Sequence, residues 1–286
     1  MTLVDAHHHL WDLGVRDQTW ITSPELAPLR RSFLLPDLEA EARAAGVTAT
    51  VLVQTVTVAE ETPEFLALAD RSELVGAVVG WTDLTSPGVA DELARLRSLP
   101  GGGFLRSIRH QVQGEADPEW LTRPEVVRGL RAVAAAGLAY DLVVLPHQLP
   151  AATRAAAAVP GLTFVLDHLG KPPVASGRLG PWSDLVRELA ALPNTVCKLS
   201  GLVTEADWRS WTVAGLAPYA DTVLDLFGPR RLMFGSDWPV CTLAAGYGEV
   251  VGLTGELIAG LSPAERDAVW SGTARRVYRM PETASV

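Results

Sequence analysis

Eight short runs of β-branched and other apolar residues recur along the chain, separated by stretches rich in Ala, Leu, Arg and Glu. From the first run to the eighth is about 230 residues, or roughly 33 per step, the length of a strand followed by a helix. The runs are too continuously apolar for strands with one face in water, so they favour a parallel sheet covered by helices. We expect strands at residues 3–6, 48–54, 74–81, 104–109, 138–144, 163–167, 195–199 and 232–236.

Helix signals fall between these runs. Residues 36–43 lead to Gly46, residues 124–136 to Gly137 and residues 182–192 to Pro193, each an ordinary helix stop. Strand, helix and stop repeat in order, which predicts an α/β protein, a single-domain (β/α)₈ TIM barrel over residues 1–286. An open doubly wound sheet is the rival, but the Gly-x-Gly-x-x-Gly turn typical of it is missing after the first strand.

Composition narrows the class of partner. The chain has 286 residues, 48% hydrophobic, and 24 Lys plus Arg against 33 Asp plus Glu, a formal charge of −9. This balance disfavours nucleic acid and anionic membrane surfaces, so we expect a small-molecule substrate, with the oligomeric state left open. Cys197 and Cys241 are too few for a disulfide framework, and no signal or membrane-spanning segment is evident. We therefore expect a cytoplasmic protein.

The first strand ends in a run of three histidines. Because side chains alternate along a strand, His7 and His9 share one face while His8 points the opposite way. Two imidazoles at the end of a barrel strand can hold a divalent ion or grip a substrate oxygen. A fortuitous run or a tag is the alternative, which the apolar strand before it and the Trp-Asp pair after it disfavour.

An aspartate follows the last strand directly. In a closed barrel the first and eighth strands are neighbours, so Asp237 should lie beside His7 and His9. The alternative is that Asp237 caps the following helix. Pro239 and the tight Gly-Ser segment that leads to Asp237 argue against it.

Three motifs in this order resemble a known family. They are the His-x-His near the N-terminus, Asp-His-Leu-Gly-Lys-Pro at 167–172 and Gly-Ser-Asp-Trp-Pro at 235–239. Together they resemble the amidohydrolase superfamily, and more closely its amidohydrolase 2 branch of sugar-lactone (L-fuconolactonase-like) hydrolases, from residue 4 to about residue 270. The resemblance implies a (β/α)₈ barrel that hydrolyses an acyl bond at the carboxyl ends of its strands. It also implies roles for His7, His9 and His168, with Asp237 as the general base.

The chain contains only two lysines, Lys171 and Lys198, and their positions discriminate within that superfamily. Binuclear members carry a carboxylated lysine on the fourth or fifth strand. Lys171 follows the sixth expected strand and Lys198 lies in the seventh. A binuclear centre is therefore disfavoured, which leaves a site with one metal ion or none.

The metal question stays open at the level of sequence. His7, His9 and Asp237 supply three ligands of the type that zinc prefers, so one divalent ion, zinc first, is the expected cofactor. His147 follows the fifth strand and is either a further ligand or a plain loop histidine. Catalysis without a metal is the alternative, because some enzymes that resemble this chain hydrolyse lactones without one.

Other polar and aromatic residues near strand ends suit a polyhydroxylated substrate. Arg106 reads as a surface cation, whereas Arg109 is a credible donor to a carbonyl or hydroxyl. Tryptophans also pack well against sugar C–H surfaces, although each is equally an ordinary core residue. The long loop at 12–36, which contains Trp20, is the expected lid. The expected substrate-binding set is Arg109, His110, Lys198, Lys171, Trp11, Trp81 and Trp238. For Lys198 the alternative is a structural lysine whose stem is buried.

These elements predict a hydrolase that opens a sugar-acid lactone, such as L-fucono- or L-rhamnonolactone. Asp237 would activate the water, and His7 and His9 would polarise the carbonyl directly or through a cation. His168 and Arg109 would stabilise the oxyanion or donate to the leaving oxygen. Two alternatives remain: a mononuclear metal-dependent decarboxylase of the same superfamily, and a non-catalytic ligand-binding barrel.

Overall fold

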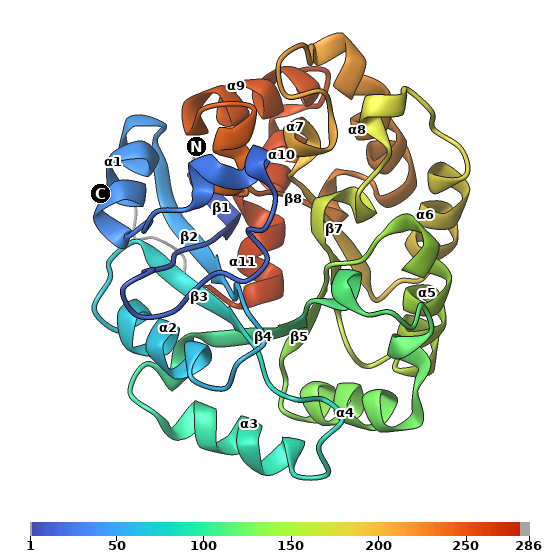
Figure 1. Cartoon of the computed structure of the whole chain (residues 1–286). Coiled ribbons are helices and arrows are strands. Elements are labelled where there is room, and N and C mark those ends of the chain that lie inside the picture. The colour runs from blue at the N-terminus through green and yellow to red at the C-terminus, as the bar shows by residue number, and fades with distance from the viewer. Residues whose placement is uncertain (1, 281–286) are drawn as a thin grey trace.

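The computed structural model describes residues 2–280 and shows eight parallel strands in one sheet, paired in chain order from β1 to β8. Figure 1 shows them curled into a barrel with helices around the outside. Each expected strand is present, within a few residues of its predicted bounds, so the predicted (β/α)₈ barrel is confirmed. The strands are β1 (Leu3–His8), β2 (Val47–Val53), β3 (Val75–Gly80), β4 (Leu105–His110), β5 (Ala139–Leu142), β6 (Phe164–Leu166), β7 (Thr195–Leu199) and β8 (Leu232–Phe234).

The helices alternate with the strands, as the spacing predicts. The three helices expected from their stop signals correspond to α1, α4 and α6. Thr212 and Ser262 cap α8 and α10 by accepting a hydrogen bond from a backbone N–H three residues on. The helices are α1 (Leu35–Ala44), α2 (Glu61–Ala69), α3 (Val89–Ser98), α4 (Pro124–Ala135), α5 (Leu149–Ala158), α6 (Trp182–Ala190), α7 (Leu202–Glu205), α8 (Val213–Phe227), α9 (Tyr247–Leu257), α10 (Pro263–Asp267) and α11 (Thr273–Tyr278).

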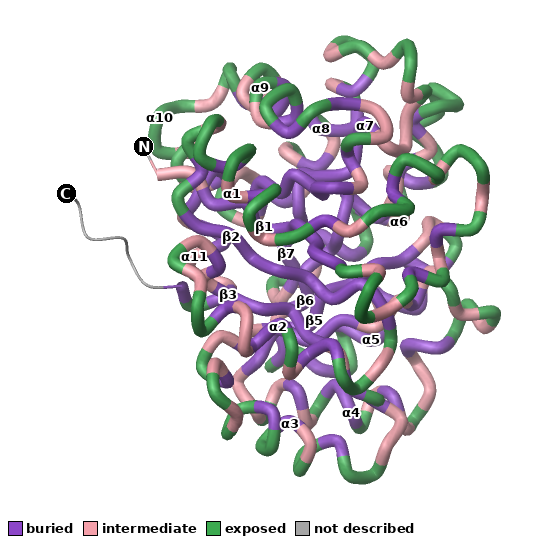
Figure 2. The backbone as a smooth tube through the Cα atoms, turned by 60° about the vertical axis from the view of Figure 1, so that its left-hand side comes forward, coloured by how far each residue is buried: buried purple, intermediate pink, exposed green. Residues whose placement is uncertain are grey.

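The interior of the barrel is apolar at one end and charged at the other. Small and branched side chains such as Val4, Val51 and Val165 form a buried cluster with residues of α11, which includes Tyr278. Figure 2 shows the strands as an almost continuously buried centre beneath more exposed helices and loops. Further along the strands, towards their carboxyl ends, buried charged residues replace the apolar ones. This polarity locates the functional end of the barrel.

The barrel closes between β1 and the residues that follow β8. A backbone hydrogen bond makes this closure: the amide of His9 donates to the carbonyl of Trp238 at 2.7 Å. The carboxylate of Asp5 adds to it by accepting from the amide of Ser236 at 2.8 Å. β1 and β8 therefore meet at the carboxyl ends of the strands, where the sequence places its motifs.

No helix among residues 2–280 combines the length and the apolar character that crossing a bilayer requires.

Candidate active site

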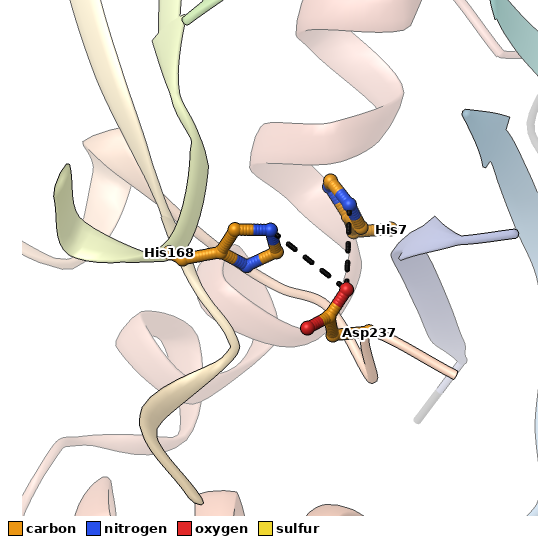
Figure 3. Close-up of side chains that lie close together, drawn as sticks. All are labelled: His7, His168 and Asp237. Carbon is orange, nitrogen blue, oxygen red and sulfur yellow. Dashed lines mark ion pairs between the residues drawn. The ribbon is translucent and has the colours of Figure 1, made fainter. Parts of the chain in front are cut away.

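Four side chains from three motifs converge at the carboxyl ends of the strands. Oδ1 of Asp237 lies 3.6 Å from Nε2 of His7, 3.6 Å from Nε2 of His9 and 3.8 Å from Nε2 of His168. Figure 3 shows the imidazoles of His7 and His168 directed at this one carboxylate. The side chains of all four residues are buried or nearly so. The structure thus brings together the residues that the sequence motifs single out.

The backbone of β1 sets the direction of its histidines. The pairing register with β2 shifts between Asp5 and His8, and this irregularity re-aims the side chains at the strand end. His7 turns into the barrel, whereas His8 bonds Thr50 through Nε2 at 2.9 Å. His9 returns to the side of His7, with the two Nε2 atoms 3.1 Å apart.

Neighbouring glycines make room for these rings. A Cβ atom at Gly235 would lie 2.7 Å from Cβ of His7, closer than real Cβ atoms approach. Gly201 has a φ of +68°, and a Cβ there would lie 2.7 Å from Nδ1 of His168. The glycines after β7 and β8 are therefore part of the site, because only glycine leaves space for the imidazoles.

Asp237 and His168 both adopt left-handed backbone conformations, with φ of 58° and 50°. Such values are uncommon for residues with a side chain, although Asp and His are enriched among them. The bond from Nδ1 of His168 to Oγ of Ser200, at 2.8 Å, fixes the imidazole. The local strain thus serves to point two side chains at a common centre.

Burial keeps the imidazoles of His7 and His168 neutral. Burial, reinforced by the nearby charge of Lys198, places the pKa of His7 well below its ordinary value. Burial also lowers the pKa of His168 to about 4. For Asp237 burial opposes ionisation, but the nearby imidazole of His168 outweighs it and holds the pKa of Asp237 below its ordinary value. At neutral pH the site therefore combines the carboxylate of Asp237 with neutral rings at His7 and His168.

A layer of buried charges lies beneath this centre. Nζ of Lys198 contacts Oδ2 of Asp141 at 2.5 Å and Oδ1 of Asp167 at 2.9 Å. Arg109 contacts the other oxygen of Asp167 at 2.9 Å and also bonds Gln54 through two nitrogens. Burial raises the pKa of Asp167, but the charge of Lys198 lowers it more, so that its pKa lies well below the ordinary value. Two cations and two carboxylates thus balance inside the barrel.

The donor set at the centre fits a divalent metal ion. A tetrahedral ion with ligand bonds of about 2.0–2.1 Å holds its ligand atoms about 3.3 Å apart. The three atoms contributed by His7, His9 and Asp237 lie 3.1, 3.6 and 3.6 Å apart, close to that spacing. The ligand atoms of His7, His168 and Asp237 also lie within 4.8 Å of one another, so His168 is a further candidate ligand.

A cavity of about 240 Å³ opens above the centre. Its polar and apolar residues come from the loops that follow most of the strands and from the predicted lid, which contributes Trp20 and Leu26. The lining residues are His9, Trp20, Leu26, Thr55, Arg109, Gln111, Gln113, Val143, His168, Lys171, Thr204, Glu205, Trp208, Asp237, Val240 and Leu243.

A family model that matches nearly the whole chain decides the family. The model of the Amidohydrolase family matches residues 4–280. The chain belongs to the Amidohydrolase family. The resemblance drawn from the three motifs is thereby confirmed.

Its relatives include named enzymes. The L-fucono-1,5-lactonase of Burkholderia multivorans is 42% identical over 98% of this chain and 97% of its own length. That of Burkholderia ambifaria is 39% identical over 97% of this chain and 95% of its own length. A crystal structure of an amidohydrolase from Burkholderia multivorans with bound zinc superposes with a TM-score of 0.92, at 40% identity, and covers 98% of this chain and 100% of that one.

In the present chain, some of the expected substrate-binding residues lie at the cavity and others lie elsewhere. Arg109 and Lys171 line the cavity, and Lys171 pairs with Glu205 at 2.9 Å. Lys198 does not line it, because its side chain is fully buried in the layer beneath. His110 is also outside the lining: its Nε2 bonds Glu115 at 2.7 Å, and its ring stacks on Trp120.

The expected tryptophans need a similar correction. Trp11 and Trp238 are buried on either side of Phe33, with ring centroids 5.1 and 5.4 Å from it, and support the cavity from behind. Trp81 lies in a separate surface depression and donates to Nδ1 of His110 at 3.0 Å. Hydrophobic packing, which the sequence alone cannot separate from substrate contact, accounts for Trp11 and Trp238.

His147 and Arg106 also lie outside the site. His147 is exposed in a short turn (Pro146–Gln148) and joins neither candidate set of metal ligands. It is therefore a loop histidine, the second of its two sequence interpretations. Arg106 is half-buried near the charges of Arg97 and Arg279, outside the cavity lining, as its interpretation as a surface cation implies.

Sequence reasoning missed several polar residues of the cavity. Each of them follows the end of a strand, and that position is the signal that could have found them. Gln111 and Gln113 stand two residues apart just after β4, at a short 3-10 turn (Val112–Gly114). The missed residues are Thr55, Gln111, Gln113, Thr204, Glu205 and Trp208.

Proposed function

We propose that this amidohydrolase hydrolyses the lactone of a sugar acid, with L-fucono-1,5-lactone as the first candidate substrate. The observation that carries the proposal is one ionised carboxylate, Asp237, within 3.6–3.8 Å of three histidines at the base of a cavity. The two relatives named L-fucono-1,5-lactonase, at 42% and 39% identity over nearly the whole chain, support it.

The cavity suits a deoxy sugar lactone. Thr55, Gln111 and Gln113 offer hydroxyl and amide groups to the hydroxyls of a sugar ring. Leu26 and Leu243, from segments that contact each other, provide an apolar part of the wall. A substrate with several hydroxyls and one methyl group matches this division.

The reaction begins with a water molecule beside Asp237. The carboxylate accepts a proton from the water as its oxygen attacks the lactone carbonyl, and a tetrahedral oxyanion forms. Because the pKa of Asp237 lies below its ordinary value, the base is ionised at neutral pH. General base catalysis of this kind contributes about 10²- to 10⁴-fold.

The oxyanion and the leaving oxygen need donors. His7 and His9 face the same side as Asp237, and His7 polarises the carbonyl, while His168 and Arg109 stand on the cavity wall. Three bonds to Gln54 and Asp167 hold the Arg109 guanidinium in place, so its charge is preorganised and needs no rearrangement during the reaction. When the ring C–O bond breaks, the proton taken up by Asp237 passes to the ring oxygen, giving the open hydroxy acid.

We propose zinc as the metal that suits this site. His7, His9 and Asp237 would hold it, since two imidazole nitrogens and a carboxylate oxygen are ordinary zinc ligands. When bound, zinc supplies a Lewis acid for the carbonyl. The relative with bound zinc supports this assignment.

A panel of lactones tests the proposed function. Acid release is followed with a pH indicator for L-fucono-, L-galactono- and L-rhamnonolactones, each with and without a chelator. We expect turnover of at least one sugar lactone, with the 6-deoxy L-fucono compound preferred. A carbon dioxide assay with aromatic carboxylic acids runs in parallel. Carbon dioxide release without lactone turnover would favour the decarboxylase, and neither activity would favour a ligand-binding barrel.

A further inference from the structure

Lys198 is a buried ammonium group with three close partners. It lies in β7 with no exposed surface, and its Nζ contacts Oδ2 of Asp141 at 2.5 Å, Oδ1 of Asp167 at 2.9 Å and Nδ1 of His7 at 3.0 Å. An ammonium carries three N–H donors and has no lone pair. Two of these contacts, to Asp141 and to His7, have hydrogen-bond geometry, whereas Oδ1 of Asp167 is an ion-pair partner without a hydrogen bond. Because an ammonium can only donate, Nδ1 of His7 receives the hydrogen bond.

This contact determines where the proton of the His7 ring lies. A neutral imidazole carries one N–H, so a ring that accepts at Nδ1 has its proton at Nε2. An imidazolium has N–H groups at both nitrogens and cannot accept from Lys198. In the geometry observed, Nε2 of His7 is therefore a donor.

The hydrogen bonds of His9 agree with this assignment. Its Nδ1 lies 2.8 Å from the carbonyl oxygen of Val53, which can only accept. His9 therefore carries its proton at Nδ1 and presents a bare lone pair at Nε2. That lone pair lies 3.1 Å from Nε2 of His7. A single chain of donation runs from Lys198 through His7 and His9 to Val53.

A hydrogen-bond acceptor, Asp167, competes with the donor Lys198 for the same nitrogen of His7. Oδ1 of Asp167 lies 3.4 Å from Nδ1 of His7 and can only accept. A histidine that binds a metal through one nitrogen ordinarily donates its other N–H to a carboxylate or carbonyl. His9 meets that condition through Val53. His7 meets it only if its proton moves to Nδ1 and is accepted by Asp167 instead of Lys198.

We propose that Lys198 is a positioning residue that holds His7 in the tautomer protonated at Nε2 and so weakens the binding of a divalent metal at His7, His9 and Asp237. A metal ion needs the lone pair that this tautomer hides. The positive charge 3.0 Å from the ring opposes a dication in addition. Lys198 thereby favours a site in which His7 donates a hydrogen bond to substrate. The inference concerns metal affinity and proton position, and it holds whichever substrate the enzyme acts on.

The substitution is designed to keep the buried charges balanced. Lys198 and Arg109 face Asp141 and Asp167, so Lys198→Met alone leaves one carboxylate in excess. The double variant Lys198→Met with Asp141→Asn removes one charge of each sign and keeps the cluster neutral. Tyr278→Phe is the matched control, because its hydroxyl donates to Asp141 at 2.8 Å within the same cluster.

The experiment needs no substrate, so its outcome is independent of the lactonase proposal. Chelator-treated protein labelled with ¹⁵N at its six histidines is studied by long-range proton–nitrogen NMR, with His7 assigned from a His7→Gln spectrum. We expect the wild type to carry the His7 proton at Nε2 and the double variant to carry it at Nδ1. Zinc affinity, measured by competition with a chromogenic chelator, should rise at least tenfold in the double variant and stay within twofold in Tyr278→Phe.

Two results would overturn the proposal. One is a wild-type His7 protonated at Nδ1, which requires no variant to observe and so does not depend on whether the double variant folds. The other is a zinc affinity in a folded double variant that is unchanged or weaker than that of the wild type.

Discussion

The backbone amide of Asp237 donates to the carbonyl of His7 at 2.8 Å, so the general base and the first-strand histidine are tied together at the seam of the barrel. Just after β1, the amide of His9 donates to the carbonyl of Trp238 across the same seam. The side chains of His7 and Asp237 emerge from these tied segments, and Nε2 of His7 lies 3.6 Å from Oδ1 of Asp237. The geometry of the site is therefore fixed by barrel closure rather than by a mobile loop.

Substitution of Asp237 by Asn should lower kcat for the lactone by about 10²- to 10⁴-fold, since Asn keeps the shape of the side chain but cannot accept the proton from water. Asn also tolerates the left-handed conformation, with φ of 58°, that residue 237 adopts. We therefore expect an unchanged circular dichroism spectrum and a similar Tm. A folded variant with near-native kcat would show that Asp237 is not the base.

Asp5 should make the stability of the fold depend on pH. Its two oxygens accept from the amide and hydroxyl of Ser236 and from Tyr247, which clamps the segment before Asp237 to β1. Burial, only partly offset by these bonds, raises the pKa of Asp5 from 3.8 to about 6. The native state thus holds this proton more tightly than the unfolded chain does. The ionised form is penalised above pH 6, and the penalty disappears as the pH falls through 6 towards 4.

The difference between 3.8 and about 6 corresponds to about 3 kcal/mol. Between pH 7 and pH 4 the free energy of unfolding of the wild type should therefore rise relative to that of Asp5→Asn by up to this amount. Urea titrations at several pH values measure the difference, with the exposed Asp184→Asn as control. A constant difference across this range would contradict the raised pKa of Asp5.

The barrel and its catalytic motifs were predictable because both depend on local patterns. Continuous apolar runs reveal buried parallel strands, and residues that end those strands share one rim, as His7, His168 and Asp237 do. The layer beneath was not predictable in the same way. Lys198 and Asp141 are 57 positions apart and meet only because alternate residues of β5 and β7 point into the barrel at the same height. Spacing along one strand carries no information on that height, and the lysine was therefore expected at the mouth.

The dependence of kcat/KM on pH should show no step near the ordinary pKa of histidine. Burial lowers the pKa of His168 to about 4, and the pKa of Asp237 lies below its ordinary value. The active form, with Asp237 ionised and His168 neutral, therefore persists as the pH falls from 7 to about 5 and is lost only around pH 4. Chromatography of the acid product from chelator-treated enzyme measures the profile, with circular dichroism to confirm folding at each pH. An inflection near pH 6.5 would place a different histidine in control.

Variants of two tryptophans distinguish a residue that contacts substrate from one that supports the fold. Trp208 lines the cavity and is partly exposed, whereas Trp11 is buried, donates to the carbonyl of Arg31 at 2.7 Å and packs against Trp20 and Phe33. Trp208→Leu should lose an aromatic contact with the sugar of about 1 kcal/mol, which raises KM about fivefold with little change in Tm.

Trp11→Leu should do the reverse. It leaves a cavity in the core and removes the hydrogen bond to Arg31, a cost of about 3 kcal/mol. Tm should therefore fall by about 5 °C or more, while KM for the lactone stays within about twofold. Steady-state kinetics and thermal unfolding of the two variants, measured side by side, provide the comparison. If Trp11→Leu instead raised KM and left Tm unchanged, the indole of Trp11 would contact the substrate, and its position behind the cavity wall would not describe the enzyme at work.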